Sequence, residues 1–163
     1  MADEVDTVVA GRSPSAAELQ ELAHLERAID EALRLYPPAY LMFRQPTDDV
    51  ELGGYTVPAG TTLSLPPWVV HRDERWWEAP DTYRPDRFND EDSDRPEYAY
   101  FPFGGGPRHC IAMRFARMEM KSVVATLLTQ FEFDVAESSE FAVEAASNLR
   151  LAHPVKLRLR NRR

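Results

Sequence analysis

One stretch of the chain combines residue types that could do chemistry, and it runs from Phe101 to Ala112. It contains the single cysteine, Cys110, shortly after three glycines and a proline, which allow the backbone to bend tightly. A run of helix-forming residues follows, so we expect Cys110 at a helix N-terminus. The free N–H groups and the dipole of a helix N-terminus favour an anion and lower the pKa of a thiol, which yields the thiolate that binds metal. Arg108 adds a positive charge nearby.

Taken alone, a single cysteine is more often a small buried apolar residue than a ligand. The residues around Cys110 favour the role of a metal ligand. Phe103, Gly106, Arg108 and Cys110 form F-x-x-G-x-R-x-C, which resembles the haem-ligand loop of the cytochrome P450 family, the haem-thiolate monooxygenases. The resemblance implies haem b bound through the Cys110 thiolate. The family usually has Gly where this chain has Ala112, a change that narrows the approach of the helix to the porphyrin.

A second pattern pairs Glu31 with Arg34 on a predicted helix, three residues apart and therefore on one face. Such a pair is ordinarily a solvated ion pair worth under about 1 kcal/mol. Here it resembles the family's E-x-x-R helix, and residues 83–88 resemble its P-x-R-F segment. The resemblance implies a buried structural network of Glu31, Arg34 and Arg87 that holds the loop before the cysteine against the helix.

The resemblance also assigns residues around the cofactor. It implies a substrate pocket lined by Ala39, Tyr40, Leu41, Met42 and Phe43. Arg44 and Arg108 would bind the haem propionates; the alternative for Arg44, a surface arginine at a strand start, stays open. His71 belongs to a segment similar to the family's H-R-D, and we assign it no catalytic role, because a lone histidine is more often structural. His109 is expected to point away from the iron.

The composition narrows the class of protein. Among 163 residues, 27 acidic and 19 basic side chains give a net charge of −8, which disfavours nucleic-acid binding. One cysteine excludes internal disulfides and multi-cysteine zinc sites. We find no apolar run of membrane-spanning length and no signal peptide in the acidic N-terminus, and therefore expect no membrane partner and a cytoplasmic location.

The elements that must position these residues are predicted to form a mainly α fold with small antiparallel sheets, an α+β class. Apolar residues at spacings of three and four predict a helix over about 13–36, as one helix or two. It starts at Ser13-Pro14 or at the capping box Ser15-x-x-Glu18. A small β region is predicted over about 39–70, a helix over about 111–130 and C-terminal strands over about 131–160.

The predicted 111–130 helix has an apolar stripe that we expect to be buried. Its members are Ala116, Met120, Val123, Val124, Leu127 and Leu128. Arg114, Arg117 and Lys121 form a basic face, either solvated or a docking site for an acidic electron donor.

The resemblance covers nearly the whole chain but only about the last two-fifths of the family's usual length, so residues 1–163 are interpreted as a partial cytochrome P450 domain. The family's oxygen-binding helix would precede residue 1. Three hypotheses follow. The chain is the C-terminal part of a monooxygenase that inserts one oxygen atom from O₂ into a small apolar substrate, a haem-binding remnant without turnover, or a cofactor-free interaction module. The first implies a ferredoxin or flavoprotein reductase as electron donor, and the remaining N-terminal part, as a separate chain, is a further expected partner.

Overall fold

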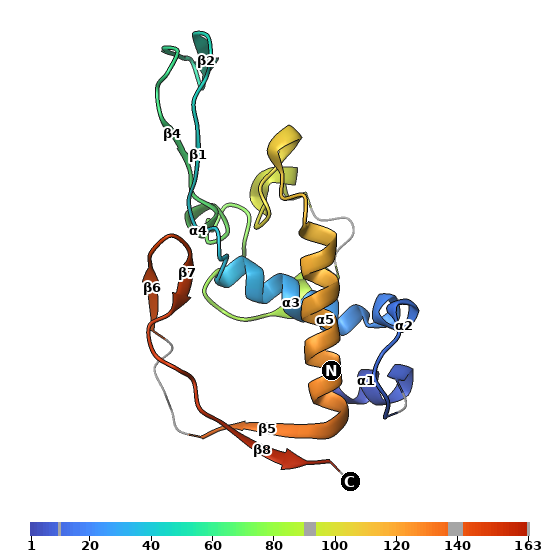
Figure 1. Ribbon diagram of the computed structural model, residues 1–163. Coiled ribbons are helices and arrows are strands. Elements are labelled where there is room, and N and C mark those ends of the chain that lie inside the picture. The colour runs from blue at the N-terminus through green and yellow to red at the C-terminus, as the bar shows by residue number, and fades with distance from the viewer. Residues whose placement is uncertain (10, 90–93, 137–141, 163) are drawn as a thin grey trace.

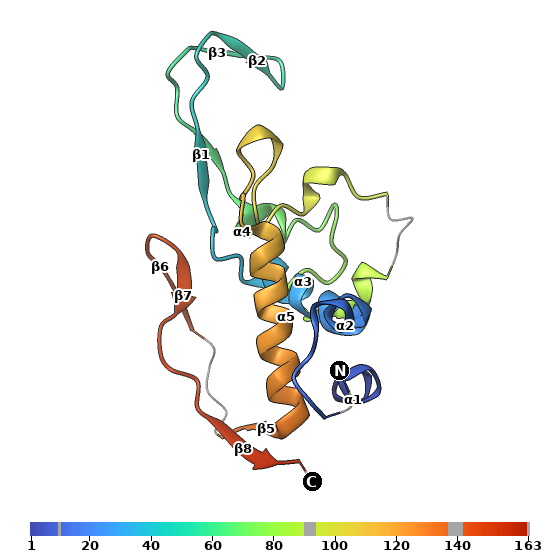
Figure 2. The ribbon, with the colours of Figure 1, turned by 45° about the vertical axis from the view of Figure 1, so that its right-hand side comes forward.

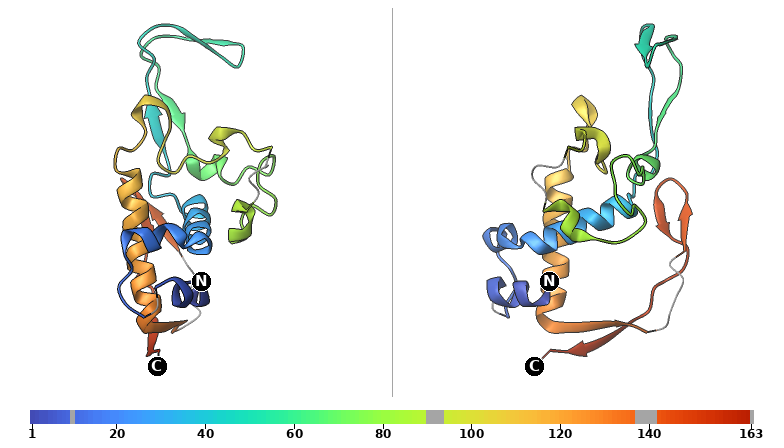
Figure 3. Two further views of the ribbon diagram at one scale, coloured as in Figure 1. Left: turned by 90° about the vertical axis from the view of Figure 1, so that its right-hand side faces the viewer. Right: turned by 180° about the vertical axis from the view of Figure 1, so that it is seen from behind.

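The structure is a computed structural model that describes residues 1–9, 11–89, 94–136 and 142–162. Its longest element is α5 (Met113–Gln130), which forms the axis of the molecule (Figure 1). The three N-terminal helices lie on one side of α5, and the paired strands extend away from it as separate ribbons (Figure 2). Both termini lie near the C-terminal end of α5, as the rotated views in Figure 3 also show.

The N-terminal helices are α1 (Ala2–Val9), α2 (Ala16–Glu21) and α3 (Ala23–Leu35). The chain over 13–36 is therefore two helices, which meet at Leu22. Of the two predicted starts, the capping box is the one observed: the Glu18 N–H donates to Ser15 Oγ, and the Ser15 N–H donates to Glu18 Oε2.

Helix α1 was not predicted from the sequence. Its signal was the spacing of Val5, Val8 and Val9, which places three apolar side chains on one face of a single short helix. Val5 and Val9 are fully buried. They join a core that the first three helices build against α5 with Leu19, Leu22, Leu25, Ile29, Leu33 and Ala125.

The prediction for the buried face of α5 was wrong in part. Met120, Val124 and Leu128 pack against the core, but Val123 is 53% exposed and Leu127 is 39% exposed. The centre of the inward face is instead Lys121 and Ala125. The pattern of apolar residues did not identify this face, because Lys121 lies on it and forms an ion pair with Glu26 of α3.

In the described part of the chain, the strands form four antiparallel two-stranded ladders. In the predicted 39–70 region, β1 (Met42–Arg44) pairs with β4 (Leu63–Leu65), and β2 (Val50–Leu52) pairs with β3 (Tyr55–Val57), so this region has two ladders rather than one sheet. The short helix α4 (Pro67–Val70) follows them.

In the C-terminal region, β5 (Phe131–Val135) pairs with β8 (Leu157–Asn161), and β6 (Val143–Ala145) pairs with β7 (Leu149–Leu151). The predicted range 131–160 includes residues 137–141, which lie outside the described residues. The alternating apolar residues of β8 are exposed, so this alternation does not mark a buried face.

Among the described residues between α4 and α5 there are three short 3₁₀ helices. They are η1 (Pro85–Phe88), η2 (Glu97–Ala99) and η3 (Gly106–Arg108). The mixture of helices with small antiparallel ladders agrees with the predicted α+β class.

Candidate functional site

The loop before α5 folds back so that Cys110 lies beside Phe103. Gly104 and Gly106 adopt φ values of 75° and 65°, in the left-handed region that favours glycine. The Cys110 N–H donates to the Phe103 carbonyl at 2.9 Å, which closes the loop. Helix α5 begins at Met113, so Cys110 precedes its first residue by three positions, where the sequence placed the cysteine directly at the N-terminus.

The loop and strand β1 enclose a cleft of about 410 Å³. Cys110 and Arg108 line it from the loop, and Met42 and Arg44 line it from β1. Phe103, Ala39 and Met120 are among the apolar residues that complete its wall. The cleft thus brings together a thiol, two guanidinium groups and an apolar wall from segments that are far apart in the sequence.

Several residues that the sequence assigned to the cofactor or substrate do not line this cleft. Phe43 is 55% exposed, because it alternates with Met42 and Arg44 along β1 and so faces the opposite way. The Tyr40 hydroxyl donates to the Ala146 carbonyl at 3.0 Å, toward the β6–β7 hairpin. Leu41 is half-buried outside the cleft.

Two loop positions assigned to the cofactor, Gly106 and Ala112, are exposed and also lie outside the cleft lining. Ala112 is the residue at which α5 is capped. His109 is exposed, and its Nδ1–H donates to the Gly106 carbonyl at 3.0 Å, so the ring is held by its own loop. Arg44 ends β1 rather than starting it.

Glu31, Arg34 and Arg87 form a buried ionic cluster. Glu31 and Arg34 are fully buried on α3, and Arg87 of η1 is 5% exposed. Arg34 donates to both Glu31 carboxylate oxygens, through Nε at 2.7 Å and Nη2 at 2.9 Å. Arg87 Nε reaches Glu31 Oε1 at 3.0 Å, and the Arg84 N–H reaches the same oxygen at 2.8 Å.

The electrostatics of the cluster follow from these bonds. Burial pushes the pKa of the Glu31 carboxyl upward, but the hydrogen bonds from Arg34, the Arg84 N–H and Arg87 outweigh it and bring the pKa below its usual value. The carboxylate is therefore ionised and fully hydrogen-bonded inside the protein.

His71 connects this cluster to the cysteine loop. The ring is fully buried, and its Nε2 accepts from the Phe101 N–H at 2.9 Å. Nδ1 therefore carries the proton and faces the Arg34 carbonyl at 3.2 Å. Burial lowers the pKa of His71 to about 4, and the charges of Arg34 and Arg72 lower it as well. Sequence reasoning left this residue without a role; the only signal was its H-R-D segment.

Comparisons with known proteins relate this geometry to a family. The family model described as Cytochrome P450 matches residues 1–159. The chain belongs to the cytochrome P450 family. It is 36% identical over 99% of its length to cytochrome P450 3A27 of Oncorhynchus mykiss. It is 38% identical over 95% of its length to putative cytochrome P450 132 of Mycobacterium bovis.

A third relative is the lithocholate 6-beta-hydroxylase of Mesocricetus auratus, at 35% identity over 98% of this chain. The matches cover 32%, 34% and 33% of these three relatives, so the chain spans about a third of the length of the curated cytochromes P450 that it matches.

The residues of the cleft fit the haem group that the cytochrome P450 family implies. Cys110 is exposed and its sulfur is the soft ligand that iron accepts in a porphyrin. Met42 and Phe103 offer an apolar surface to the macrocycle, and Arg44 and Arg108 offer cations to its two carboxylates. Within the described residues, no group of three or more His, Cys, Asp or Glu side chains is placed to hold a metal ion by itself.

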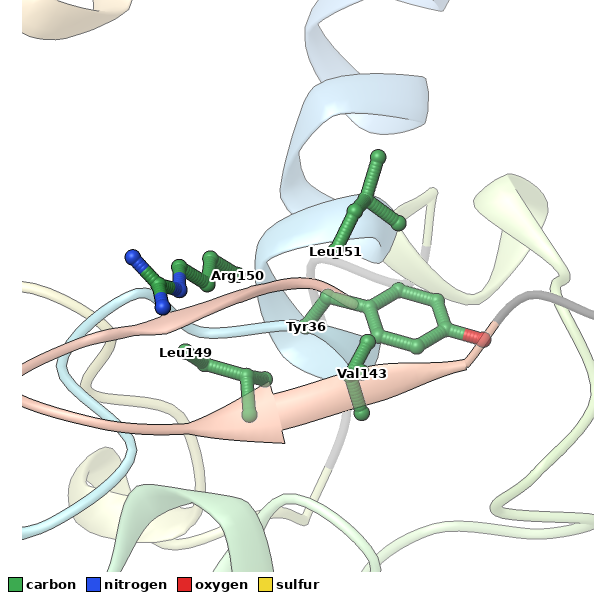
Figure 4. Close-up of a pocket in the computed structure, with 5 residues that line it drawn as sticks. All are labelled: Tyr36, Val143, Leu149, Arg150 and Leu151. Carbon is green, nitrogen blue, oxygen red and sulfur yellow. The ribbon is translucent and has the colours of Figure 1, made fainter. Parts of the chain in front are cut away.

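A second pocket, of about 330 Å³, shares no lining residue with the Cys110 cleft. It lies between Tyr36, just after α3, and the β6–β7 hairpin, as Figure 4 shows. Val143, Leu149, Arg150 and Leu151 complete it.

In the part of the chain that the structure describes, no helix is long and apolar enough to cross a membrane.

Proposed function

We propose that this chain is the haem-binding part of a cytochrome P450 monooxygenase, with Cys110 as the thiolate ligand. One observation carries the proposal: the exposed sulfur of Cys110 shares a cleft with Arg44, Arg108 and an apolar wall. When bound, haem with an axial thiolate supplies the chemistry of O–O bond cleavage. The proposed reaction inserts one oxygen atom from O₂ into a small apolar organic substrate, with electrons from a ferredoxin or flavoprotein reductase.

The chain's own residues have distinct tasks in this proposal. Cys110 presents its sulfur from a loop that its own N–H closes onto the Phe103 carbonyl. Met42 and Phe103, which line the cleft, would exclude water from the sulfur side, and backbone N–H groups beyond Cys110 would hydrogen-bond to the thiolate. Arg44 and Arg108 would bind the two haem carboxylates and so orient the haem in the cleft.

The relatives support this class of reaction without identifying a substrate. One is named for the hydroxylation of lithocholate, and a hydroxylation is the insertion of one oxygen atom. Because the relatives are about three times as long as this chain, turnover is tested separately from haem binding.

The test is the spectrum of the reduced carbon monoxide complex after haem reconstitution. We expect the red-shifted Soret band of thiolate ligation in the wild-type chain and its loss in Cys110→Ser. Ile111→Ala is the matched control, since Ile111 is the next residue and is 99% exposed. A thiolate-type band that survives in Cys110→Ser would remove the assignment.

Two other outcomes identify the alternatives. A thiolate-type band without product formation, when an electron donor and O₂ are supplied, indicates a haem-binding remnant. A folded chain that takes up no haem indicates a cofactor-free interaction module.

A further inference from the structure

A second ionic cluster lies between α3 and α5. Arg117 Nη2 of α5 binds Asp30 Oδ1 of α3 at 2.6 Å. The Tyr100 hydroxyl, just before the loop, donates to the same Asp30 oxygen at 2.9 Å. The guanidinium carbon of Arg117 also lies 5.7 Å from the centre of the Phe103 ring, within cation–π range. One side chain therefore contacts both helix α3 and the ring that lines the cleft.

These groups are shielded from solvent. The side chains of Arg117 and Asp30 are 25% and 13% exposed. Burial, together with the Asp30 carboxylate, raises the pKa of Tyr100, so the phenol stays protonated and keeps donating to Asp30. Burial works against the charge of Arg117, but Asp30 outweighs it and raises the guanidinium pKa. The Arg117 guanidinium therefore keeps its charge.

A neighbouring cation provides a contrast. Lys121, one turn further along α5, binds Glu26 Oε2 of α3 through Nζ at 3.0 Å, and Arg117 Nη1 lies 3.6 Å from the other oxygen of the same carboxylate. Its side chain is 9% exposed, less than that of Arg117. Both cations join α3 to α5, but it is Arg117 that lies within cation–π range of the Phe103 ring. The two residues therefore share a link between the helices through Glu26 and differ in the contacts of Arg117 with Asp30 and the Phe103 ring.

We propose that Arg117, held by Asp30, is a positioning residue for Cys110: it fixes the Phe103 ring, and the Phe103 carbonyl in turn fixes the Cys110 backbone. Only the test that measures haem loss rests on the proposed function. The link from ring to sulfur is the 2.9 Å hydrogen bond from the Cys110 N–H to the Phe103 carbonyl. A ring free to move would loosen that bond and with it the direction of the sulfur.

The first test uses the chain without haem and measures amide hydrogen exchange by NMR. Arg117→Gln should raise the exchange rate of the Cys110 N–H about tenfold, because the bond to Phe103 opens more often. Lys121→Gln, the matched control, should leave that rate within about twofold of wild type while it lowers thermal stability comparably. Equal acceleration in both variants, or none in Arg117→Gln, would overturn the proposal.

A double-mutant cycle makes the link to the ring explicit. In a Phe103→Leu background, where the ring is gone, Arg117→Gln should add no further acceleration at Cys110. A full additional tenfold effect would mean that Arg117 acts through another route and would reject the proposed link. Should Arg117→Gln fail to fold, Asp30→Asn removes the opposite charge and is expected to act in the same direction, and Arg117→Lys, which keeps the pair, should restore most of the protection.

The haem-loaded protein gives the second readout. Arg117→Gln should lose haem about tenfold faster than wild type, as supports of metal ligands commonly do, and Lys121→Gln should not. If the wild-type chain binds no haem, the proposed function fails, and the hydrogen-exchange comparison alone then decides whether Arg117 positions Cys110.

Discussion

The Glu31 cluster and the Cys110 loop treat their reactive groups in opposite ways. The Glu31 carboxylate is fully buried and accepts from Arg34, Arg87 and the Arg84 N–H. The Cys110 side chain is exposed in a cleft, on a loop held by backbone hydrogen bonds and glycine conformations. The chain buries charged side chains where they hold the backbone in one conformation. It leaves the Cys110 sulfur accessible where a ligand can bind. The predictions below test each half.

The largest effect is expected at the buried cluster. Glu31→Ala or Arg87→Ala leaves its partners charged and buried, which typically costs about 3–5 kcal/mol. We expect loss of soluble folded protein, measured by yield and urea unfolding. Glu144→Ala is the control, because Glu144 pairs with Arg150 on the exposed β6–β7 hairpin and should cost under about 1 kcal/mol. Near-normal stability of both cluster variants would contradict the buried role.

The next largest effect is a pH dependence of the free energy of unfolding. It arises at His71, which contacts both Arg34 of the Glu31 cluster and Phe101 of the cysteine loop. The folded-state pKa of His71 is about 4, below the ordinary value of 6.5, so the unfolded chain binds the proton more readily. The stabilisation by neutral His71 is complete above about 6.5 and is lost as the pH falls toward 4, by up to about 1.4 kcal/mol per pH unit. His71→Gln should remove this slope in urea unfolding, whereas replacement of the exposed His153 should not.

The contributions of Glu31 and His71 to stability can be told apart, because each is lost in a different pH range. The pKa of Glu31 lies below its ordinary value of 4.5, so its contribution is present above that value and is lost only at lower pH. A destabilisation that begins only below about pH 4.5 in the wild-type chain would contradict the assignment to His71.

A smaller effect is expected on the open side, at the two cleft arginines. Arg44→Ala or Arg108→Ala each removes one charge-assisted partner of a haem carboxylate and should speed haem loss about tenfold. Thermal stability without haem should stay unchanged, because Arg108 is exposed and Arg44 only half-buried. Arg114→Ala, an exposed arginine on α5, is the control. Unchanged haem retention in both cleft variants would remove the carboxylate role.

The smallest effect is expected at a loop glycine. Gly104→Ala forces a left-handed conformation, with φ near 75°, on a residue with a Cβ and should cost about 1–2 kcal/mol. Gly60→Ala has the same conformational cost at φ of 77° but lies in the β3–β4 connection. We expect similar losses of thermal stability in the two variants and slower haem uptake only in Gly104→Ala. Slower uptake in both would show that the loop geometry is not specific.

The elements with local signals could be predicted from the sequence. The capping box at Ser15, the proline stop after α3 and the Gly53-Gly54 turn between β2 and β3 each act within a few residues. Contacts between distant residues could not be predicted this way. The inward direction of Lys121 depends on Glu26, 95 residues earlier, and the role of His71 depends on Phe101.

The candidate site shows the same division. The motif around Cys110 was readable because its residues are adjacent, and so was the i, i+3 pair of Glu31 and Arg34. Which of residues 39–43 line the cleft depends on the alternation of β1, and that alternation places Met42 toward the cleft and Phe43 away from it.

The coil between α4 and η1 takes its shape from two guanidinium groups. Arg34 and Arg87 donate to the main-chain carbonyls of His71, Glu78, Ala79 and Thr82, none of which belongs to a helix or strand. Every amino acid carries such a carbonyl, so these bonds hold the backbone at exposed positions such as Glu78 and Thr82 whichever side chain stands there. The two arginines thus fix the course of the coil through groups common to all residues, and the buried side chains of His71 and Trp77 are the part of the segment that depends on its own sequence.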